Sequence, residues 1–262
     1  MTLVWKSGWN GLTESEAIDY VAAVEAADGQ ELEFGVAKAI NDFVLGCKLD
    51  GIWNAIKASC ILAGASTLDG ALVPLVGGAP TNNNFVSGDY DRETGLKGDG
   101  STKYIDTGRD NNADPQNNNH ISVYVTEEVT SPNTPQIFMA ASGGTGSVTR
   151  LIQNANNNLN VKSNDSGALY TIVANGGLGT GLKGVARSSS SSYTVRTNAL
   201  NTTGSNASDI PDNTRLSVFR RTDNTQYLTA RLSFYSIGES LDLAKLDTRV
   251  SNLMTAIGAA IP

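Results

Sequence analysis

The chain carries few side chains that could serve as a catalytic base. His120 is its only histidine, and it precedes the apolar segment Ile121–Val125. A hydrolase triad needs such a base beside a serine, yet no Gly-x-Ser-x-Gly turn is present to hold that serine. We therefore expect the imidazole of His120 to make a structural hydrogen bond at a strand edge.

Carboxylates are the other catalytic candidates, because glycoside hydrolysis uses two of them about 5–9.5 Å apart across one bond. The glutamates of the β-rich body are Glu93, Glu127, Glu128 and Glu239. Glu127 and Glu128 are adjacent, so a strand would point them to opposite faces. Asp89 and Asp91 do alternate, but the glycines around them indicate a turn. We expect no catalytic residue and no enzymatic activity.

One acidic loop could hold a metal ion. Asp110, Asn112 and Asp114 alternate along the chain and offer the oxygen ligands that a hard cation such as calcium prefers. The loop lacks the glycine and the distal glutamate of a dedicated calcium loop. A polar turn between two strands is the favoured interpretation, calcium is the alternative, and no other cofactor is expected.

The two cysteines are expected to be buried and reduced. Cys47 falls on an apolar helical stripe, and Cys60 precedes Ile61 and Leu62. A buried free cysteine behaves as a small hydrophobic residue. A disulfide between the two is the alternative.

The net charge of −7 is concentrated near the N-terminus. Residues 1–70 hold ten acidic and four basic side chains, a net of −6, while the rest hold sixteen and fifteen, a net of −1. A phosphate backbone requires a basic surface, so nucleic acid is not expected as a partner. No apolar run approaches the roughly 18 residues of a membrane span, so membrane insertion is not expected either.

Residues 1–68 are expected to form an acidic helical segment that docks on another surface. The run Thr13-Glu14-Ser15-Glu16 matches a capping box and begins a helix that ends at Asp28-Gly29. The second helix carries one apolar stripe, made of Leu32, Val36, Ala39, Ile40, Phe43, Val44 and Cys47. A third helix is predicted from Asp50 to about Gly64. Trp5 and Trp9 are candidate docking anchors, with packing on their own helices as the alternative.

Residues 69–238 change to the pattern of short strands separated by Gly, Asn and Ser. About eleven strands are predicted, and so many short strands with almost no helix are typical of a β-sandwich or barrel. The predicted strands are 72–76, 103–106, 121–125, 136–140, 148–152, 159–162, 169–173, 182–186, 193–196, 216–220 and 228–234.

Three segments of this body resemble one family. The run from Gly95 to Asp106 is similar to an opening hairpin with a tight Gly-Asp-Gly-Ser turn, and 182–187 with 193–196 is similar to a central pair of strands. Residues 228–241 resemble a closing strand. Together they resemble laminin-G-like, concanavalin A-type folds, which implies an antiparallel jelly-roll β-sandwich. With the helical patterns at both ends, the expected fold class is mainly β, with an N-terminal three-helix segment and a C-terminal helix.

Residues 239–262 are expected to form a C-terminal helix. Leu243, Leu246, Val250, Leu253 and Ile257 recur at intervals of three and four, with Asp247 and Arg249 at outward positions. The stripe spans about two heptads, and a coiled coil requires three or four. The helix is therefore expected to pack on the sandwich or the head, or at a subunit contact.

The whole chain also resembles structural proteins of tailed bacteriophages, cyanophages among them. The resemblance rests on the head with Val44-Leu45-Gly46-Cys47-Lys48-Leu49-Asp50-Gly51-Ile52-Trp53, on Gly95–Asp106 and on the tail Leu243–Ile261. It implies a non-enzymatic virion protein assembled in the host bacterial cytoplasm, in a tail fibre, tail tip or other appendage. Capsid decoration and a free carbohydrate-binding lectin are the alternatives.

The partners implied by this resemblance are other virion proteins and further copies of the chain, with a trimer favoured. Host surface glycan is the expected ligand of an appendage. The tyrosines are scattered about one per strand, as core and rim packing would place them, so no glycan-binding residues are predicted.

Overall fold

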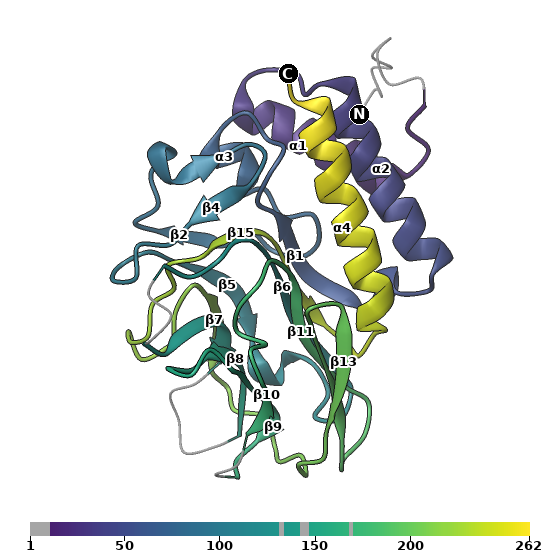
Figure 1. The fold of residues 1–262 in the computed structure, drawn as a ribbon. Coiled ribbons are helices and arrows are strands. Elements are labelled where there is room, and N and C mark those ends of the chain that lie inside the picture. The colour runs from purple at the N-terminus through teal and green to yellow at the C-terminus, as the bar shows by residue number, and fades with distance from the viewer. Residues whose placement is uncertain (1–10, 131–133, 142–146, 168–169) are drawn as a thin grey trace.

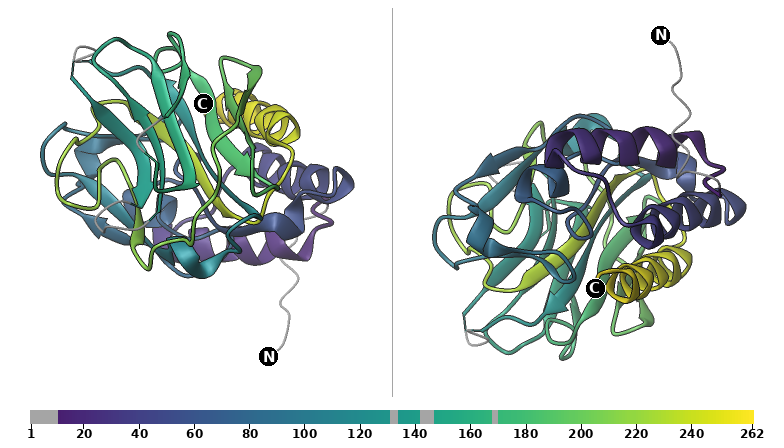
Figure 2. Two further views of the ribbon diagram at one scale, coloured as in Figure 1. Left: turned by 90° about the horizontal axis from the view of Figure 1, so that it is seen from below. Right: turned by 90° about the horizontal axis from the view of Figure 1, so that it is seen from above.

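The computed structural model describes residues 11–130, 134–141, 147–167 and 170–262 of the 262-residue chain. Its elements form three layers (Figures 1 and 2). A layer of helices lies on the outer face of one antiparallel sheet, sheet A, and a second antiparallel sheet, sheet B, packs on the other face. The mainly β sandwich with flanking helices is confirmed. No helix in the described ranges has the length and apolar character to cross a bilayer.

Sheet A contains eight strands, and its centre is built from segments far apart in the sequence. The strand β15 (Arg231–Gly238) pairs with β6 (Asn119–Glu127) on one side and with both β1 (Ile56–Ile61) and β4 (Gly95–Lys97) on the other. The order continues from β6 through β11 (Gly181–Arg187), β12 (Tyr193–Thr197) and β13 (Leu200–Gly204), and from β4 to β3 (Tyr90–Asp91).

Sheet B contains seven strands, all antiparallel to their neighbours. Their order is β10 (Thr171–Val173), β9 (Leu159–Asp165), β8 (Val148–Gln153), β7 (Gln136–Ala141), β14 (Arg215–Val218), β5 (Tyr104–Asp110) and β2 (Thr81–Asn83). Ile105 faces the core between the sheets, while Tyr104 is only half-buried.

Two hydrophobic cores hold the three layers together. The core between the sheets includes Val123, Phe138, Val161 and Tyr235, and the core under the helices includes Phe43, Leu182, Phe234 and Leu246. Sheet A therefore has apolar side chains on both faces, which is the pattern of a sheet buried on both sides. Sheet B has a small apolar cluster on its outer face, made of Ile137, Ala140 and Ile152.

The helical layer consists of α1 (Ser15–Asp28), α2 (Phe34–Leu49) and α4 (Leu243–Ala260), with the short α3 (Leu68–Ala71) beside α1. The predicted stripes of α2 and α4 are confirmed, because both are buried in the core under the helices. Glycine allows the two helices to approach closely: a Cβ placed at Gly35 would lie 2.7 Å from the Cβ of Ala260. α4 is docked on α2 and on strands β11 and β12.

The predicted capping box of α1 is wrong. The helix begins at Ser15 with Glu14 as its N-cap, and no side chain of its own first turn caps it. The Oδ1 atom of Asn41 on α2 instead accepts hydrogen bonds from the backbone of Thr13 (2.7 Å) and Glu14 (2.9 Å). Asn41 is buried, so the α1–α2 contact supplies the cap that the local sequence was expected to supply.

The predicted third helix from Asp50 to Gly64 is also wrong. A short 3₁₀ turn, Trp53–Ala55, is followed by the strand β1, which pairs along β15 from Ile56 to Ile61. Residues of β1 contribute to both cores, with Ile61 under the helices and Cys60 between the sheets. Successive side chains can be buried on opposite faces only in a strand. Packing in both cores therefore favours a strand here, although the apolar residues are spaced as in a helix.

Two further predictions in the body are corrected. Residues 72–76 form no strand, and only Val76 makes an isolated bridge to Ser59. The segment Gly95–Asp106 forms no hairpin, because β4 lies in sheet A and β5 in sheet B. The turn at Asp99 carries the chain from one sheet to the other.

The strand predicted at residues 228–234 is confirmed as β15, but the regular alternation of a strand, which would place Leu232 and Phe234 on one face, is broken. The register with β6 shifts between Leu232 and Phe234, so the two side chains do not share a face. Leu232 lies between the sheets, and Phe234 lies under the helices against Phe43, with ring centroids 5.7 Å apart. The extra residue of this bulge reverses the alternation in the middle of the strand.

Candidate functional site

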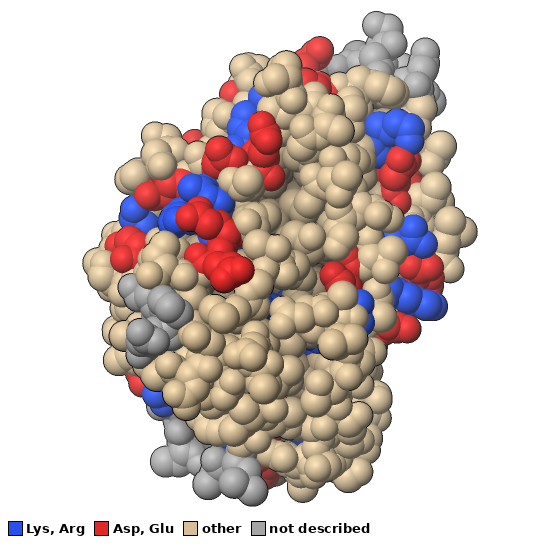
Figure 3. Space-filling model, in the orientation of Figure 1, with Lys and Arg blue, Asp and Glu red and all other residues tan. Residues whose placement is uncertain are grey.

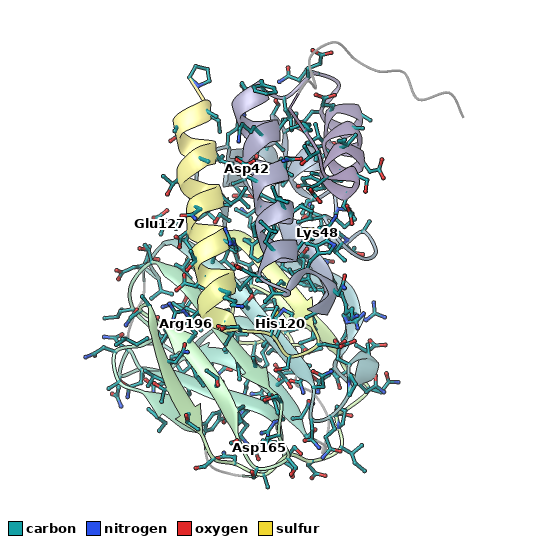
Figure 4. The ribbon with its side chains drawn as sticks, turned by 90° about the vertical axis from the view of Figure 1, so that its right-hand side faces the viewer. Asp42, Lys48, His120, Glu127, Asp165 and Arg196 are labelled. Carbon is teal, nitrogen blue, oxygen red and sulfur yellow. The ribbon has the colours of Figure 1, made fainter. Side chains whose placement is uncertain are left out.

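His120 is buried beneath the helical layer and has the predicted structural role (Figure 4). Its Nδ1 lies 2.5 Å from the backbone oxygen of Glu239 and its Nε2 lies 2.9 Å from the Oγ of Ser236. Because a carbonyl only accepts, Nδ1 carries the proton and Nε2 accepts from Ser236. Burial lowers the pKa of His120 to about 4. The ring is neutral at pH 7 and is enclosed, so it cannot reach a substrate.

Of the carboxylates considered for glycoside hydrolysis, Glu127, Asp89 and Asp91 lie in ion pairs or turns. Glu127 pairs with Lys97 and with Arg231, and the hydrogen bond from Lys97 lowers its pKa. Asp89 pairs with Lys103, and Asp91 accepts hydrogen bonds within its own turn from Glu93 and Thr94. Each of these three carboxylates is therefore held by a cation or by its own turn.

The calcium candidates lie around a short 3₁₀ turn, Asn111–Ala113, at the end of β5. Asp114 is held by Arg109, with N–O distances of 2.9 and 2.6 Å, and Asp110 is held by Arg215 at 2.7 Å. Asn112 is exposed. The described ranges contain no group of three His, Cys, Asp or Glu side chains placed to bind a metal ion. Both carboxylates of this loop already have a guanidinium partner.

Both cysteines are free and buried, as predicted. Desolvation raises the pKa of each thiol to about 12. Neither is a reactive nucleophile, because the thiolate is the reactive form. The proposed docking anchors Trp5 and Trp9 lie outside the described residues.

A groove between α4 and the edge of sheet A is the strongest candidate for a ligand site. We call it the helix–sheet groove, and it has a volume of about 490 Å³. Figure 1 shows the first half of α4 lying beside β11 and β13. The groove is lined by Tyr124, Thr180, Gly181, Leu182, Arg196, Asn198, Ala199, Asp247, Thr248, Ser251 and Asn252.

The wall between the strands and α4 is held in place by two polar contacts. The Nε of Arg196 on β12 lies 2.8 Å from Oδ2 of Asp247, and both side chains are largely buried. Asp247 was predicted to point outward from the helix, but this ion pair holds it against the sheet. The hydroxyl of Tyr124 lies 3.3 Å from the Oγ of Ser251. Strand and helix residues therefore form one fixed surface.

The floor of the groove offers an aromatic ring beside hydrogen-bonding groups. Tyr124 and Leu182 face each other across β6 and β11, and Tyr124 is half-buried. The rim carries the exposed side chains of Asn198, Thr248 and Asn252. A pocket that combines an apolar floor with a few placed polar groups can orient a small polar ligand.

The turn at the rim has a restricted backbone. Asn198 and Ala199 join β12 to β13 with φ angles of 51° and 58°. Both central residues of a two-residue hairpin turn adopt positive φ, which alanine does at a steric cost. The hairpin pairs Thr197 with Leu200 directly beneath this turn, and the side-chain amide of Asn198 donates a 3.5 Å hydrogen bond to the backbone oxygen of Asn175 at the rim.

Two other hollows are less suited to a ligand. A hollow of about 550 Å³ lies among loops at the end opposite the helices, where Figure 4 labels Asp165. Its side chains are small and bond one another, as Asn206 does with Asp165 (2.6 Å) and Ser166 with Asp209 (2.6 Å). A hollow of about 210 Å³ between α2 and α4 is lined partly by Phe43 and Leu253 of the helical core.

Sequence reasoning did not find the helix–sheet groove. Its residues come from four separate segments, and their proximity depends on the docking of α4 across β11 and β12. The one available signal was Asp247, an acidic residue inside an apolar helix beside Leu246. Because Asp247 was predicted to point outward, its ion pair with Arg196 on β12 was not expected.

The fold is similar to that of several solved structures. No protein-family model and no curated protein sequence matches the chain. The binding domain of botulinum neurotoxin serotype D is similar with a TM-score of 0.50 and 7% identity, over 76% of this chain and 50% of that one. This chain thus spans about half of that structure, and the likeness establishes a shared sandwich fold.

Two sialidase structures show weaker similarity. A Trypanosoma rangeli sialidase mutant displaying trans-sialidase activity has a TM-score of 0.49 and 10% identity, over 83% of this chain and 39% of that one. The CBM40 domain of Ruminococcus gnavus IT-sialidase, bound to alpha2,3 sialyllactose, has a TM-score of 0.42 and 11% identity, over 64% of this chain and 96% of that one.

Proposed function

We propose that the chain is a non-enzymatic carbohydrate-binding module whose ligand lies in the helix–sheet groove. The observation that carries the proposal is the half-buried ring of Tyr124 among the side chains of Asn198, Asn252 and the Arg196–Asp247 pair. A sugar ring has an apolar face and a polar edge. Its apolar face would stack on the ring of Tyr124, and its hydroxyl edge would hydrogen-bond to the amides and charged groups.

The remaining surface supports a neutral sugar as the ligand. On the face shown in Figure 3, charged side chains gather over the helices and nearby loops, and most of the sandwich is uncharged. Inside the groove the charges of Arg196 and Asp247 offset each other at 2.8 Å. A neutral sugar hydroxyl loses little free energy on leaving water when a side chain of the groove replaces its hydrogen bond to water.

Binding without catalysis is the favoured activity for this groove. Asp247 is its one carboxylate, and Arg196 and Ser251 bond both of its oxygens. Glycoside hydrolysis by the common mechanism needs a second carboxyl group across the scissile bond. The described lining of the groove supplies hydrogen bonds and a ring.

A glycan array probed with the recombinant full chain tests this proposal. We expect saturable binding to a restricted set of glycans that share one exposed neutral sugar. Uniformly blank arrays, at protein concentrations up to the millimolar range typical of weak single-site binding, would contradict it.

We further propose that the module is an appendage component of a tailed-phage particle. The support is the sequence resemblance, together with a helical layer that exposes Phe34, Leu45 and Leu49 at 50%, 36% and 76% on one helix, α2. Contiguous exposed apolar patches mark docking surfaces, and Leu45 and Leu49 lie one turn apart on the same face of α2. Attachment through the helices would leave the sandwich free to meet host glycan, and a trimer is the expected assembly.

Mass spectrometry of particles dissected into capsid and tail fractions tests the particle role. The chain is expected in the tail fraction of purified particles. Detection in the capsid fraction would contradict the appendage role and indicate a capsid decoration protein. Absence from purified particles would contradict both particle roles and leave the free lectin. Light scattering of the recombinant protein is expected to give the mass of a trimer, and a monomer at high concentration would contradict self-assembly.

A further inference from the structure

Two cations lie side by side on the outer face of sheet B, far from the helix–sheet groove. Arg150 on β8 pairs in register with Lys162 on β9, and each is flanked by residues that point into the core between the sheets, such as Leu151 and Val161. Arg150 and Lys162 therefore share the outer face. Like charges placed directly opposite each other across two strands are destabilising.

Both cationic side chains are covered. Arg150 is 9% exposed and Lys162 is 4% exposed. The ring of Tyr170 lies over both, with its centroid 4.6 Å from Cζ of Arg150 and 5.0 Å from Nζ of Lys162. Arg150 donates to the hydroxyl of Tyr170, and Lys162 donates to the backbone oxygen of Gly167. The Nε of Arg150 is buried without a hydrogen-bond partner.

Asp165 acts on Lys162 and Asp223 acts on Arg150 only through longer-range attraction, without an ion pair. All 26 acidic residues lie in the described part of the chain, and none there forms an ion pair with Arg150 or Lys162. The nearby Asp223 pairs with Arg221 at 3.3 Å. Burial lowers the pKa of Arg150 to about 10, and it also lowers the pKa of Lys162. Buried charges are normally paired, and one aromatic ring replaces only a small part of that stabilisation.

We propose that Arg150, Lys162 and Tyr170 form an oxyanion site on sheet B that takes a carboxylate or sulfate group of an acidic polysaccharide. A guanidinium offers two parallel N–H donors to such a group and an ammonium adds a point charge. Tyr170 would swing aside or stack on the sugar that carries the anion. The site shares no residue with the helix–sheet groove, so it stands whether or not the groove binds a neutral sugar.

Calorimetric titration of the full chain with hexagalacturonate tests the proposal, with its fully methyl-esterified form as the matched neutral ligand. We expect saturable binding of the acid form and at least tenfold weaker binding of the ester. Sodium sulfate against sodium chloride at equal ionic strength is the free-anion arm. If sulfate binds saturably and hexagalacturonate does not, the oxyanion site stands but its assignment to a polysaccharide is overturned. If neither ligand binds, both the site and its assignment are overturned.

Lys162→Met separates this site from a purely structural contact. Without ligand we expect its melting temperature to rise by a few degrees, since a like charge is removed, while its affinity for hexagalacturonate falls at least tenfold. Lys38→Met, at an exposed position on α2, is the control and should change neither. Lys162→Gln repeats the test if the methionine variant does not fold. An affinity within twofold of the natural chain would overturn the proposal.

Discussion

At the scale of single residues, burial decides what the chemically capable side chains do. His120 is enclosed between Glu239 and Ser236, and both cysteines are desolvated thiols. The sequence predicted these structural roles because each residue stands beside apolar neighbours. Tyr124 and Asp247 could not be assigned in the same way, since their exposure depends on an element that is distant in the sequence.

His120 should make the stability of the fold depend on pH. Its pKa is about 4 in the folded chain and about 6.5 when unfolded, so protonation favours unfolding. Neutral His120 therefore contributes its full stabilisation to the fold above pH 6.5. As the pH falls towards 4 the free energy of unfolding decreases by roughly 3 kcal/mol in all. Urea unfolding of the natural chain and of His120→Gln between pH 7 and 4.5 measures it. The variant should lose less stability over this range, and equal losses would contradict the assigned environment.

At the scale of elements, α4 joins the helical layer to the sandwich. Leu246, Val250 and Ile257 are fully buried, and Arg249 pairs with Asp50 at 2.7 Å beyond the end of α2. The same helix supplies Asp247, Ser251 and Asn252 to the groove. Removing α4 would therefore open the core and dismantle one wall of the proposed site.

Leu246→Ala should destabilise the fold by about 3 kcal/mol, because it removes buried methyl groups and leaves a cavity. Leu49→Ala is the matched control on α2, where the side chain is 76% exposed, and should change the free energy of unfolding by less than about 0.5 kcal/mol. Chemical denaturation measures both. Similar small losses in the two variants would mean that α4 is a dispensable tail.

Much of the element pattern could be predicted from sequence, because local periodicity reflects which face is buried. The stripes of α2 and α4 and most strands of both sheets follow this rule. The errors share one cause. The cap from Asn41, the strand β1 and the bulge in β15 are each set by contacts between distant segments, which single-sequence patterns do not contain.

At the scale of the whole molecule, the two sheets have different surroundings. The helices cover the outer face of sheet A and leave the groove only at its β11–β13 edge, while sheet B turns its outer face away from them (Figure 2). Attachment through the exposed side chains of α2 would leave the groove open at this edge, while the cations on sheet B lie on the far side under the ring of Tyr170. This arrangement suits a module that is fixed at one side and recognises saccharide with the other.

Calorimetric titration of variants tests whether a sugar binds against Tyr124 in the helix–sheet groove. With the best glycan from the array, Tyr124→Ala and Asn198→Ala should each weaken binding about tenfold or more, a loss of about 1.4 kcal/mol. Tyr227→Ala, a half-buried tyrosine outside the groove, should bind like the natural chain. Unchanged affinity in both groove variants, with their folds intact by circular dichroism, would contradict the claim.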